Sequence, residues 1–353
     1  VTANLAGELT YSIDVLASDL VADENVTASV ATTDAAGNTT TVTANHAVGV
    51  DVVAPTIEIT NEASGNATTS LAKVGDTITA NFTSTDPVTS VTIGGHAAQL
   101  TLVNAVTGTY TATYVVASGD NAIATDVVVT SRDTAGNTTT QTLSGRVTVD
   151  TVAPTATITL SDDALRIGDT STVTITFSEA VSGFSLSDLT ANNGTLSNLS
   201  SATVNANGTV TYTATFTPNS NIEDTTNVVS LTTGYTDTVG NTGTTAESAN
   251  YTIDTLAPTA TITVNTVTSD NVINQSELAA GNVPVTGTVG GDVKVGDIVT
   301  LTINGHTYVG GVTANLAGEL TYSIDVLASD LVADENVTAS VATTDAAGNT
   351  TTV

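Results

Sequence analysis

The stretch VTANLAGELTYSIDVLASDLVADENVTASVATTDAAGNTTTV fills residues 1–42, and it occurs again, letter for letter, at residues 312–353. The offset between the two copies is 311 residues. A fixed long period is the signature of a repeat architecture, in which each unit is a separate structural module. We therefore expect slightly more than one period of an array, excerpted from a longer protein, with both ends falling inside a module.

A shorter period lies within the long one and is marked by three similar linkers. They read VDVVAP at 50–55, VDTVAP at 149–154 and IDTLAP at 253–258. Their prolines are 99 and 104 residues apart, which is the usual size of an immunoglobulin-type sandwich. The sequence thus predicts the C-terminal part of one module at 1–53, complete modules at 54–152 and 153–257, and a module at 258–353 that stops in its last strand.

The segments between the linkers have the pattern of β-strands. TSTVTITFS (170–178), GTVTYTATFTP (208–218) and DIVTLTING (297–305) alternate apolar residues with threonine or other polar residues, as half-buried strands do. Only IDVLASDLVADE (13–24) could form a short turn of helix. The predicted fold class is all-β, with tandem immunoglobulin-like β-sandwich modules in an elongated array.

The charge of the chain excludes several classes of partner. It has 35 acidic and 5 basic residues, and its formal net charge is −30. Nucleic-acid binding needs a basic face, and docking on anionic lipid needs clustered lysine or arginine. No apolar run approaches the roughly 20 residues of a membrane span, and cysteine, methionine and tryptophan are absent. The composition suits a protein that meets divalent cations outside the cell.

An Asp-x-x-Gly-Asn motif recurs once in each module. Asp is a turn former, and Gly and Asn accept left-handed backbone, so the motif is typical of a hairpin turn. It could also be a cation site, because it offers a carboxylate, carbonyls and an amide. A linker aspartate follows each of the first three turns at the same spacing, which permits a shared site only if the chain doubles back. The turn residues are Asp34 and Asn38, Asp133 and Asn137, Asp237 and Asn241, and Asp345 and Asn349, and the linker residues are Asp51, Asp150 and Asp254.

Calcium takes six to eight oxygen ligands from carboxylates, carbonyls, amides and water. The first loop of the following module could close such a shell, because TNEASGN (60–66), SDDALRIGD (161–169) and TSDNVINQSE (268–277) all carry acids or amides. The hypothesis is a Ca²⁺ site made by a turn, the linker aspartate after it and the next module's loop. The additional candidate ligands are Glu62, Asp162, Asp163, Asp270, Asn271 and Glu277. The plain turn remains the alternative.

The order of these motifs resembles a known family. D-x-x-G-N followed by V-D-T-x-A-P-T is similar to the bacterial immunoglobulin-like extender modules of large repetitive, type I-secreted (RTX or biofilm) adhesins. Residues 269–349 resemble one variety of module, FSEAVSGFSLSDLTANNGTLSNLS (177–200) a second and residues 54–152 a looser third. The resemblance implies a calcium-stiffened stalk at the bacterial cell surface, which holds a ligand-binding tip away from the cell and supports adhesion and biofilm formation.

Other functions fit the sequence less well. A self-assembling surface-layer or matrix-fibre protein shares the composition and is the main alternative, with other copies of the chain as partners besides its own neighbouring modules. A carbohydrate- or ice-binding module would need an aromatic platform or a ranked threonine array. An enzyme is not expected, since no G-x-S-x-G motif occurs and His46, His96 and His306 have no partner at a metal-binding spacing, so we expect surface or strand positions for them.

Overall fold

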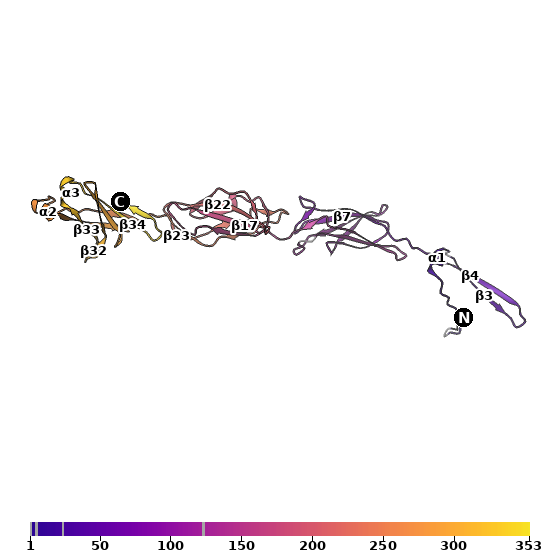
Figure 1. Cartoon of the computed structure of the whole chain (residues 1–353). Helices are drawn as coiled ribbons and strands as arrows, with labels where there is room; N and C mark the ends of the chain where they lie inside the picture. Colours follow the sequence, from indigo (N-terminus) through magenta and orange to yellow (C-terminus); the bar gives the residue numbers. More distant parts are fainter. Residues whose placement is uncertain (1, 4–5, 23–24, 122–123) are drawn as a thin grey trace. The chain divides into compact units, whose positions relative to one another are not determined.

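The computed structural model describes residues 2–3, 6–22, 25–121 and 124–353 (Figure 1). These residues form β-sheets around three separate hydrophobic cores, and the described strand pairs are antiparallel except for β6–β14 and β16–β27. The chain divides into two compact units, Val1–Val152 and Ala153–Val353. The predicted all-β class with tandem sandwiches is confirmed. Among the described helices, none is both long and apolar enough to span a membrane.

The N-terminal segment, residues 2–47, is a hairpin with a short helix before it. Strands β3 and β4 pair from Asn25↔Ala47 to Thr33↔Thr39 around the first Asp-x-x-Gly-Asn turn. The helix α1 lies where the sequence predicts one, and residues 23 and 24 of that predicted stretch lie outside the described residues. The elements are β1 (Thr2–Ala3), β2 (Leu9–Thr10), α1 (Ala17–Ala22), β3 (Asn25–Thr33) and β4 (Thr39–Ala47).

The first sandwich, residues 57–149, packs the sheet β10-β11-β7-β5 on the sheet β13-β12-β8-β9. Its strand β7 alternates strictly, so that Ile78, Ala80 and Phe82 are buried while the residues between them are half-buried. A period of two is what a strand facing a core requires. The strands are β5 (Ile57–Ser64), β6 (Leu71–Ala72), β7 (Thr77–Ser84), β8 (Val88–Ile93), β9 (His96–Ala97), β10 (Gln99–Asn104), β11 (Thr109–Val115), β12 (Val127–Arg132), β13 (Thr138–Leu143) and β14 (Thr148–Val149).

The second sandwich, residues 156–254, has the largest share of aromatic packing. Phe177 meets Phe184 and Tyr235 edge to face, at ring-centroid distances of 5.0 and 4.9 Å. Edge-to-face geometry stabilises an aromatic pair beyond the area that the two rings bury. The elements are β15 (Ala156–Leu160), β16 (Ala164–Arg166), β17 (Ser171–Phe177), β18 (Val181–Ser182), η1 (Leu186–Asp188), β19 (Leu189–Ala191), β20 (Gly194–Ser197), β21 (Thr203–Val204), β22 (Val210–Pro218), β23 (Glu223–Asn227), β24 (Val229–Leu231), β25 (Thr236–Asp237), β26 (Ala246–Glu247) and β27 (Tyr251–Asp254).

The third sandwich, residues 260–352, contains the second copy of the repeat. Its sheets are β28-β29-β33-β32 and β31-β30-β34-β35, and the long pair β29–β33 crosses its centre. The elements are β28 (Ala260–Ile262), α2 (Gln275–Ala280), β29 (Asn282–Gly291), β30 (Ile298–Ile303), β31 (His306–Gly311), β32 (Thr313–Ala314), β33 (Leu320–Leu327), α3 (Ala328–Ala333), β34 (Thr338–Thr344) and β35 (Thr350–Thr352).

Candidate functional site at the module junctions

The four Asp-x-x-Gly-Asn segments fold into one and the same closed turn. In each, the Asp N–H donates to the Asn carbonyl at 3.0–3.1 Å. The Asp Oδ1 accepts the Asn backbone N–H at 2.8–2.9 Å, and its Oδ2 accepts the Asn side-chain N–H at 2.7–3.0 Å. The glycine has φ between +92° and +106°, a conformation in which a β-carbon is strained. The motif is therefore a turn first, and the turn uses both oxygens of its aspartate.

These hydrogen bonds favour the charged form of the turn aspartate. The Asn137 side chain is the main cause that holds the pKa of Asp133 below its ordinary value of 3.8, and the Asn38 side chain has the same effect on the pKa of Asp34. At Asp345, desolvation is the largest influence and raises the pKa, but the combined bonds from Asn349, Gly348 and Ala347 outweigh it and the pKa is lowered.

The asparagine of the turn reaches beyond its own turn. The Asn137 side chain donates to the backbone carbonyl of Asp51 at 3.0 Å. In the same way, the Asn349 side chain donates to the carbonyl of Asp254 at 3.0 Å. Asp51 and Asp254 belong to the linkers that precede the first and third sandwiches. In both cases the turn of a sandwich is tied to the linker through which the chain enters that sandwich.

This pairing differs from the predicted one, in which a turn shares a site with the linker aspartate that follows it along the chain. In the first sandwich, β13 begins at Thr138 beside the turn, and the chain then runs to Asp150, whose N–H donates to Ala72 at the other end. At 3.3 Å per residue, the six residues of β13 alone cover roughly 20 Å. The predicted pairing of Asp133 with Asp150 is therefore wrong, and that of Asp237 with Asp254 fails for the same reason.

The second sandwich shows this separation of its two ends clearly. Near Asp237, the Thr244 N–H and the Tyr235 hydroxyl point to the carbonyl of Pro154, where the chain enters. Asp254 instead pairs with Arg166, where the chain leaves. A turn and the linker that follows it lie at opposite ends of one sandwich because a whole strand separates them.

The acidic loops that follow the first strand of each module also lie at the exit end. The Asp163 backbone carbonyl accepts the Thr252 N–H at 2.8 Å, near Asp254, and the Asp162 carboxylate accepts the Ala164 N–H at the start of β16. In the third sandwich, Asp270 and Asn271 accept local loop N–H groups, and Glu277 closes the capping box of α2. We expected these loops to complete a site at the junction through which the chain enters their module. The first strand of the module instead places them at the other end, where the chain leaves.

Glu62 is not a surface ligand but a buried strand residue. It lies in β5 at 5% exposure, and its Oε1 accepts the Thr125 hydroxyl. Burial is the main cause that raises its pKa above the ordinary value of 4.5. A carboxylate placed in a sandwich interior is available to a cation only if the fold opens, so its position favours a structural role.

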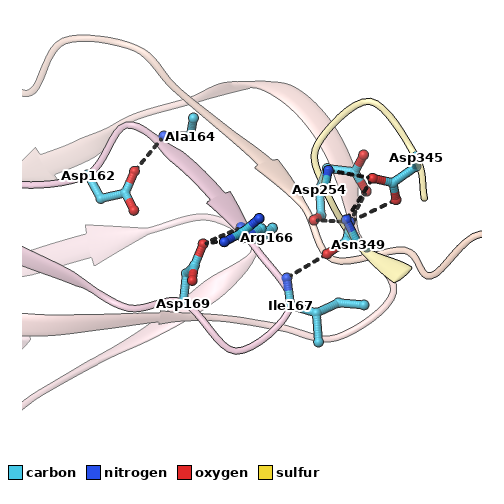
Figure 2. A network of polar contacts seen from close by, with 9 residues as sticks. Asp162, Ala164, Arg166, Ile167, Asp169, Asp254, Asp345 and Asn349 are labelled. Carbon is cyan, nitrogen blue, oxygen red and sulfur yellow. Dashed lines mark hydrogen bonds and ion pairs between the residues drawn. The ribbon is translucent and has the colours of Figure 1, made fainter. Parts of the chain in front are cut away.

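The junction between the second and third sandwiches joins three parts of the chain (Figure 2). Asn349 lies at its centre at 3% exposure. Its side-chain nitrogen meets Asp254, and its Oδ1 accepts the Ile167 N–H at 2.9 Å, from the loop that follows β16. A single amide thus bonds the turn of the third sandwich, the linker and a loop of the second sandwich. The predicted trio of turn, linker and loop exists, but the loop belongs to the preceding module and the turn to the following one.

Three of the five basic residues lie beside these turns. The sequence did not lead us to expect this arrangement. Arg166 is paired with Asp169 at 3.5 Å, and a β-carbon on Gly348 would be 2.6 Å from its Nη1. The Lys294 Nζ donates to the Thr344 carbonyl just before the last turn. Arg132 lies against Gly136. In so acidic a chain, the position of each rare cation is a signal that could have indicated the turns as sites of negative charge.

One carboxylate pair remains close together at the entry end of the second sandwich. Glu179 and Asp237 bring carboxylate oxygens within 4.8 Å of each other, and Asp237 is 2% exposed. Two like charges this close repel, and the repulsion is stronger where water is excluded. Carboxylate oxygens are the ligands that Ca²⁺ prefers, and this pair offers two of the six to eight oxygens that such an ion takes. The amides of Asn137 and Asn349 are used as hydrogen-bond links instead.

Comparison with known proteins decides the family. A model of the bacterial Ig-like domain matches residues 150–253, and a model of the bacterial Ig-like domain (group 3) matches residues 8–118. A solved structure described as "Ca2+-stabilized adhesin helps an Antarctic bacterium reach out and bind ice" is 35% identical, with a TM-score of 0.52. The match covers 100% of this chain and 85% of that one. The chain belongs to the bacterial Ig-like modules of large adhesins.

A second adhesin structure is also similar to these Ig-like modules. It is described as "Structural insight into host cell surface retention of a 1.5-MDa bacterial ice-binding adhesin", with 28% identity, a TM-score of 0.44 and coverage of 86% of this chain and 96% of that one. Among curated protein sequences, none matches the chain. With the two family models and the first structure, the predicted resemblance to adhesin modules is confirmed.

Proposed function

We propose that these Ig-like modules form a non-enzymatic stalk of a secreted adhesin at the bacterial cell surface, and that they support adhesion and biofilm formation. The modules would be residues 54–152, 153–257 and 258–353, with part of another at 1–53. The observation that carries the proposal is the Asn349 amide, which bonds the linker at Asp254 and the neighbouring module at Ile167. A stalk needs its modules held end to end, and this contact limits rotation at the linker.

Calcium binding near the junctions is the second part of the proposal. The Glu179–Asp237 pair supplies carboxylate oxygens at the entry end of the second sandwich, and Asp254 lies half-buried at its exit. The charge of −30 gives a compact chain strong self-repulsion. A bound divalent cation would offset part of that repulsion. The adhesin with 35% identity is described as Ca²⁺-stabilised, which supports the same role here.

The test compares the chain in millimolar CaCl₂ with the chain in excess EGTA. Small-angle scattering measures the maximum dimension, and calorimetry measures the melting temperature. We expect calcium to raise the melting temperature and to narrow the distribution of scattering dimensions, because fixed junctions limit bending. MgCl₂ is the matched control, since Mg²⁺ demands a tighter octahedral shell. Identical scattering and melting in calcium and EGTA would rule out stiffening by calcium.

A self-assembling matrix fibre is the alternative function. It is favoured by the strongly acidic, cysteine-free composition, which such fibre proteins share. Negative-stain microscopy separates the two functions, because a stalk gives single rods and a fibre protein gives bundles or sheets.

A further inference from the structure

The two parallel strand pairs hold the same place in two different modules. Each joins a segment near the start of a sandwich to the last strand of that sandwich. In the first sandwich, β6 pairs with β14 through two residues of each strand. In the second, β16 pairs with β27 through three residues of each strand, from Ala164↔Thr252 to Arg166↔Asp254. The pair ends beside the linker through which the chain leaves, as Arg166 and Asp254 show in Figure 2.

A parallel pair in this position is loaded along its strands when the chain is pulled at its ends. The chain enters a sandwich at one end and leaves it at the other, and both segments of the pair run in that direction. Tension draws the first segment back toward the entry end and the last strand on toward the exit end. The hydrogen bonds of a parallel ladder are evenly spaced, so they share the load instead of breaking one after another.

The parallel pair must break whichever of the two segments is pulled out. If the first segment leaves the second sandwich, β15 separates from β17 and β16 separates from β27. If the last strand leaves, β27 separates from β23 and again from β16. The β16–β27 pair is therefore the step that both routes share. In the first sandwich, β6–β14 has the same position, since the first segment there also holds β5 against β7.

The side chains around both pairs exclude water from their hydrogen bonds. Leu165 and Ile253, which face each other at the centre of β16–β27, are each 1% exposed. Ala72 and Val149, which face each other in β6–β14, are buried as well. A hydrogen bond is stronger where water is excluded, and it cannot be exchanged for a bond to water until the strands have separated. These pairs are therefore suited to resist a pull.

We propose that β6–β14 and β16–β27 are force-bearing clamps, and that they determine how fast each of the two sandwiches unfolds under tension. The inference rests on the proposed stalk, because a stalk carries tension from one end of a module to the other. The clamp consists of backbone hydrogen bonds, so it holds in EGTA as it does in calcium. The longer pair gives the second sandwich the longer lifetime at a given force.

Unfolding of the full chain at constant force, pulled from its two ends in EGTA, tests the clamp. Thr252→Pro removes the N–H that donates to the Asp163 carbonyl at 2.8 Å. Ser200→Pro is the matched control, because it removes an N–H bond of the same length, to the Thr213 carbonyl, outside the parallel pair. Removing a bond speeds unfolding only if that bond is already broken in the transition state.

We expect Thr252→Pro to make the second sandwich unfold at least about fivefold faster at a given force, as the loss of one hydrogen bond implies. Ser200→Pro should stay within about twofold of the wild type, because its bond is intact in the transition state. Urea unfolding measures the equilibrium stability of both variants, which both substitutions lower. Thr148→Pro repeats the test in the first sandwich, where it removes the N–H bond to the Ser70 carbonyl at 2.9 Å.

A cysteine pair identifies the unfolding event of the second sandwich. The chain has no cysteine of its own, and facing residues of neighbouring strands lie about 5 Å apart, within disulfide reach. Oxidised Ala164→Cys with Thr252→Cys keeps the 252 − 164 = 88 residues between them from extending, so the event that disappears belongs to this sandwich. If neither Thr252→Pro nor Thr148→Pro speeds unfolding under force more than Ser200→Pro does, the clamp is overturned. The stalk itself would still stand, since scattering and microscopy test it separately.

Discussion

Asn349 donates a hydrogen bond from its side chain to the backbone carbonyl of Asp254, at 3.0 Å and across 95 residues of chain. The same side chain closes its own turn through Asp345 and accepts the Ile167 N–H. One buried amide therefore has three partners on three segments. A buried polar group left without its partners costs more than an exposed one, so this residue should control the stability of the junction.

Asn349→Ala should destabilise the junction between the second and third sandwiches by about 1–3 kcal/mol, because buried partners lose their hydrogen bonds. Urea unfolding monitored by tyrosine fluorescence gives the free energy, and scattering should show a broader range of dimensions. Asn38→Ala is the matched control, since Asn38 occupies the same place in the exposed copy of the repeat. Equal losses in the two variants would contradict a junction role for Asn349.

Gly348→Ala should cost more than Gly37→Ala. Both glycines have φ above +90°, so both variants incur the left-handed strain of about 1–2 kcal/mol. Only at Gly348 would the new β-carbon also press on Arg166, 2.6 Å away, whereas nothing lies within 4 Å at Gly37. The difference between the two variants in free energy of unfolding isolates the Arg166 contact, and it should disappear in an Arg166→Ala background.

The turn at Asp133 should make the free energy of unfolding decrease as the pH falls into the acid range. Its folded pKa is below the ordinary 3.8, mainly through the Asn137 side chain. The charged form is thus favoured on folding, and its contribution is fully present above pH 3.8 and is lost as the pH falls through the lower folded pKa. Unfolding curves between about pH 5 and pH 2 should converge for wild type and Asp133→Asn. The exposed strand variant Asp325→Asn serves as the control, and parallel curves for Asp133→Asn would contradict the prediction.

Glu62 should make stability depend on pH in the opposite direction to Asp133. Its folded pKa is raised above 4.5, mainly by burial. The folded state then binds the proton more tightly than the unfolded state, so the contribution of Glu62 to the stability of the first sandwich is fully present below pH 4.5 and is lost as the pH rises through the folded pKa. Glu62→Gln should flatten this part of the pH profile. A melting temperature of the wild type that rises across the same range, relative to the variant, would show that the sign is wrong.

Glu179→Gln should weaken the response to calcium without disturbing the turn. Glu179 lies outside the closed turn of Asp237 and Asn241, so the fold should persist. We expect a smaller rise in melting temperature on adding CaCl₂ than in the wild type, and a higher melting temperature in EGTA, because one of two close negative charges is removed. An unchanged calcium response would show that the Glu179–Asp237 pair holds no ion.

Much of the architecture could be predicted from the sequence. The alternation of Thr with apolar residues predicts the strands, and the long repeat predicts tandem modules. The turns could be located too, because Asp, Gly and Asn satisfy a closed turn within one short segment. The partners of these turns could not be predicted, since spacing along a chain does not say at which end of a sandwich a residue lies. Arg166 and Ile167 carried no local signal of their contact with the turn of the following module.

The two copies of the repeat show what sequence decides alone. In both, the Asp-x-x-Gly-Asn turn closes with the same hydrogen bonds, the hairpin forms and a short helix precedes it, because these contacts join residues near one another in the chain. Residues 320–327 form a strand while residues 11–16 do not. A strand needs a partner to bond its backbone and a second sheet to cover its apolar face. In the third sandwich, residues 260–311 supply both the partner strand and the second sheet. Only the tertiary structure therefore decided whether this sequence forms part of a sandwich.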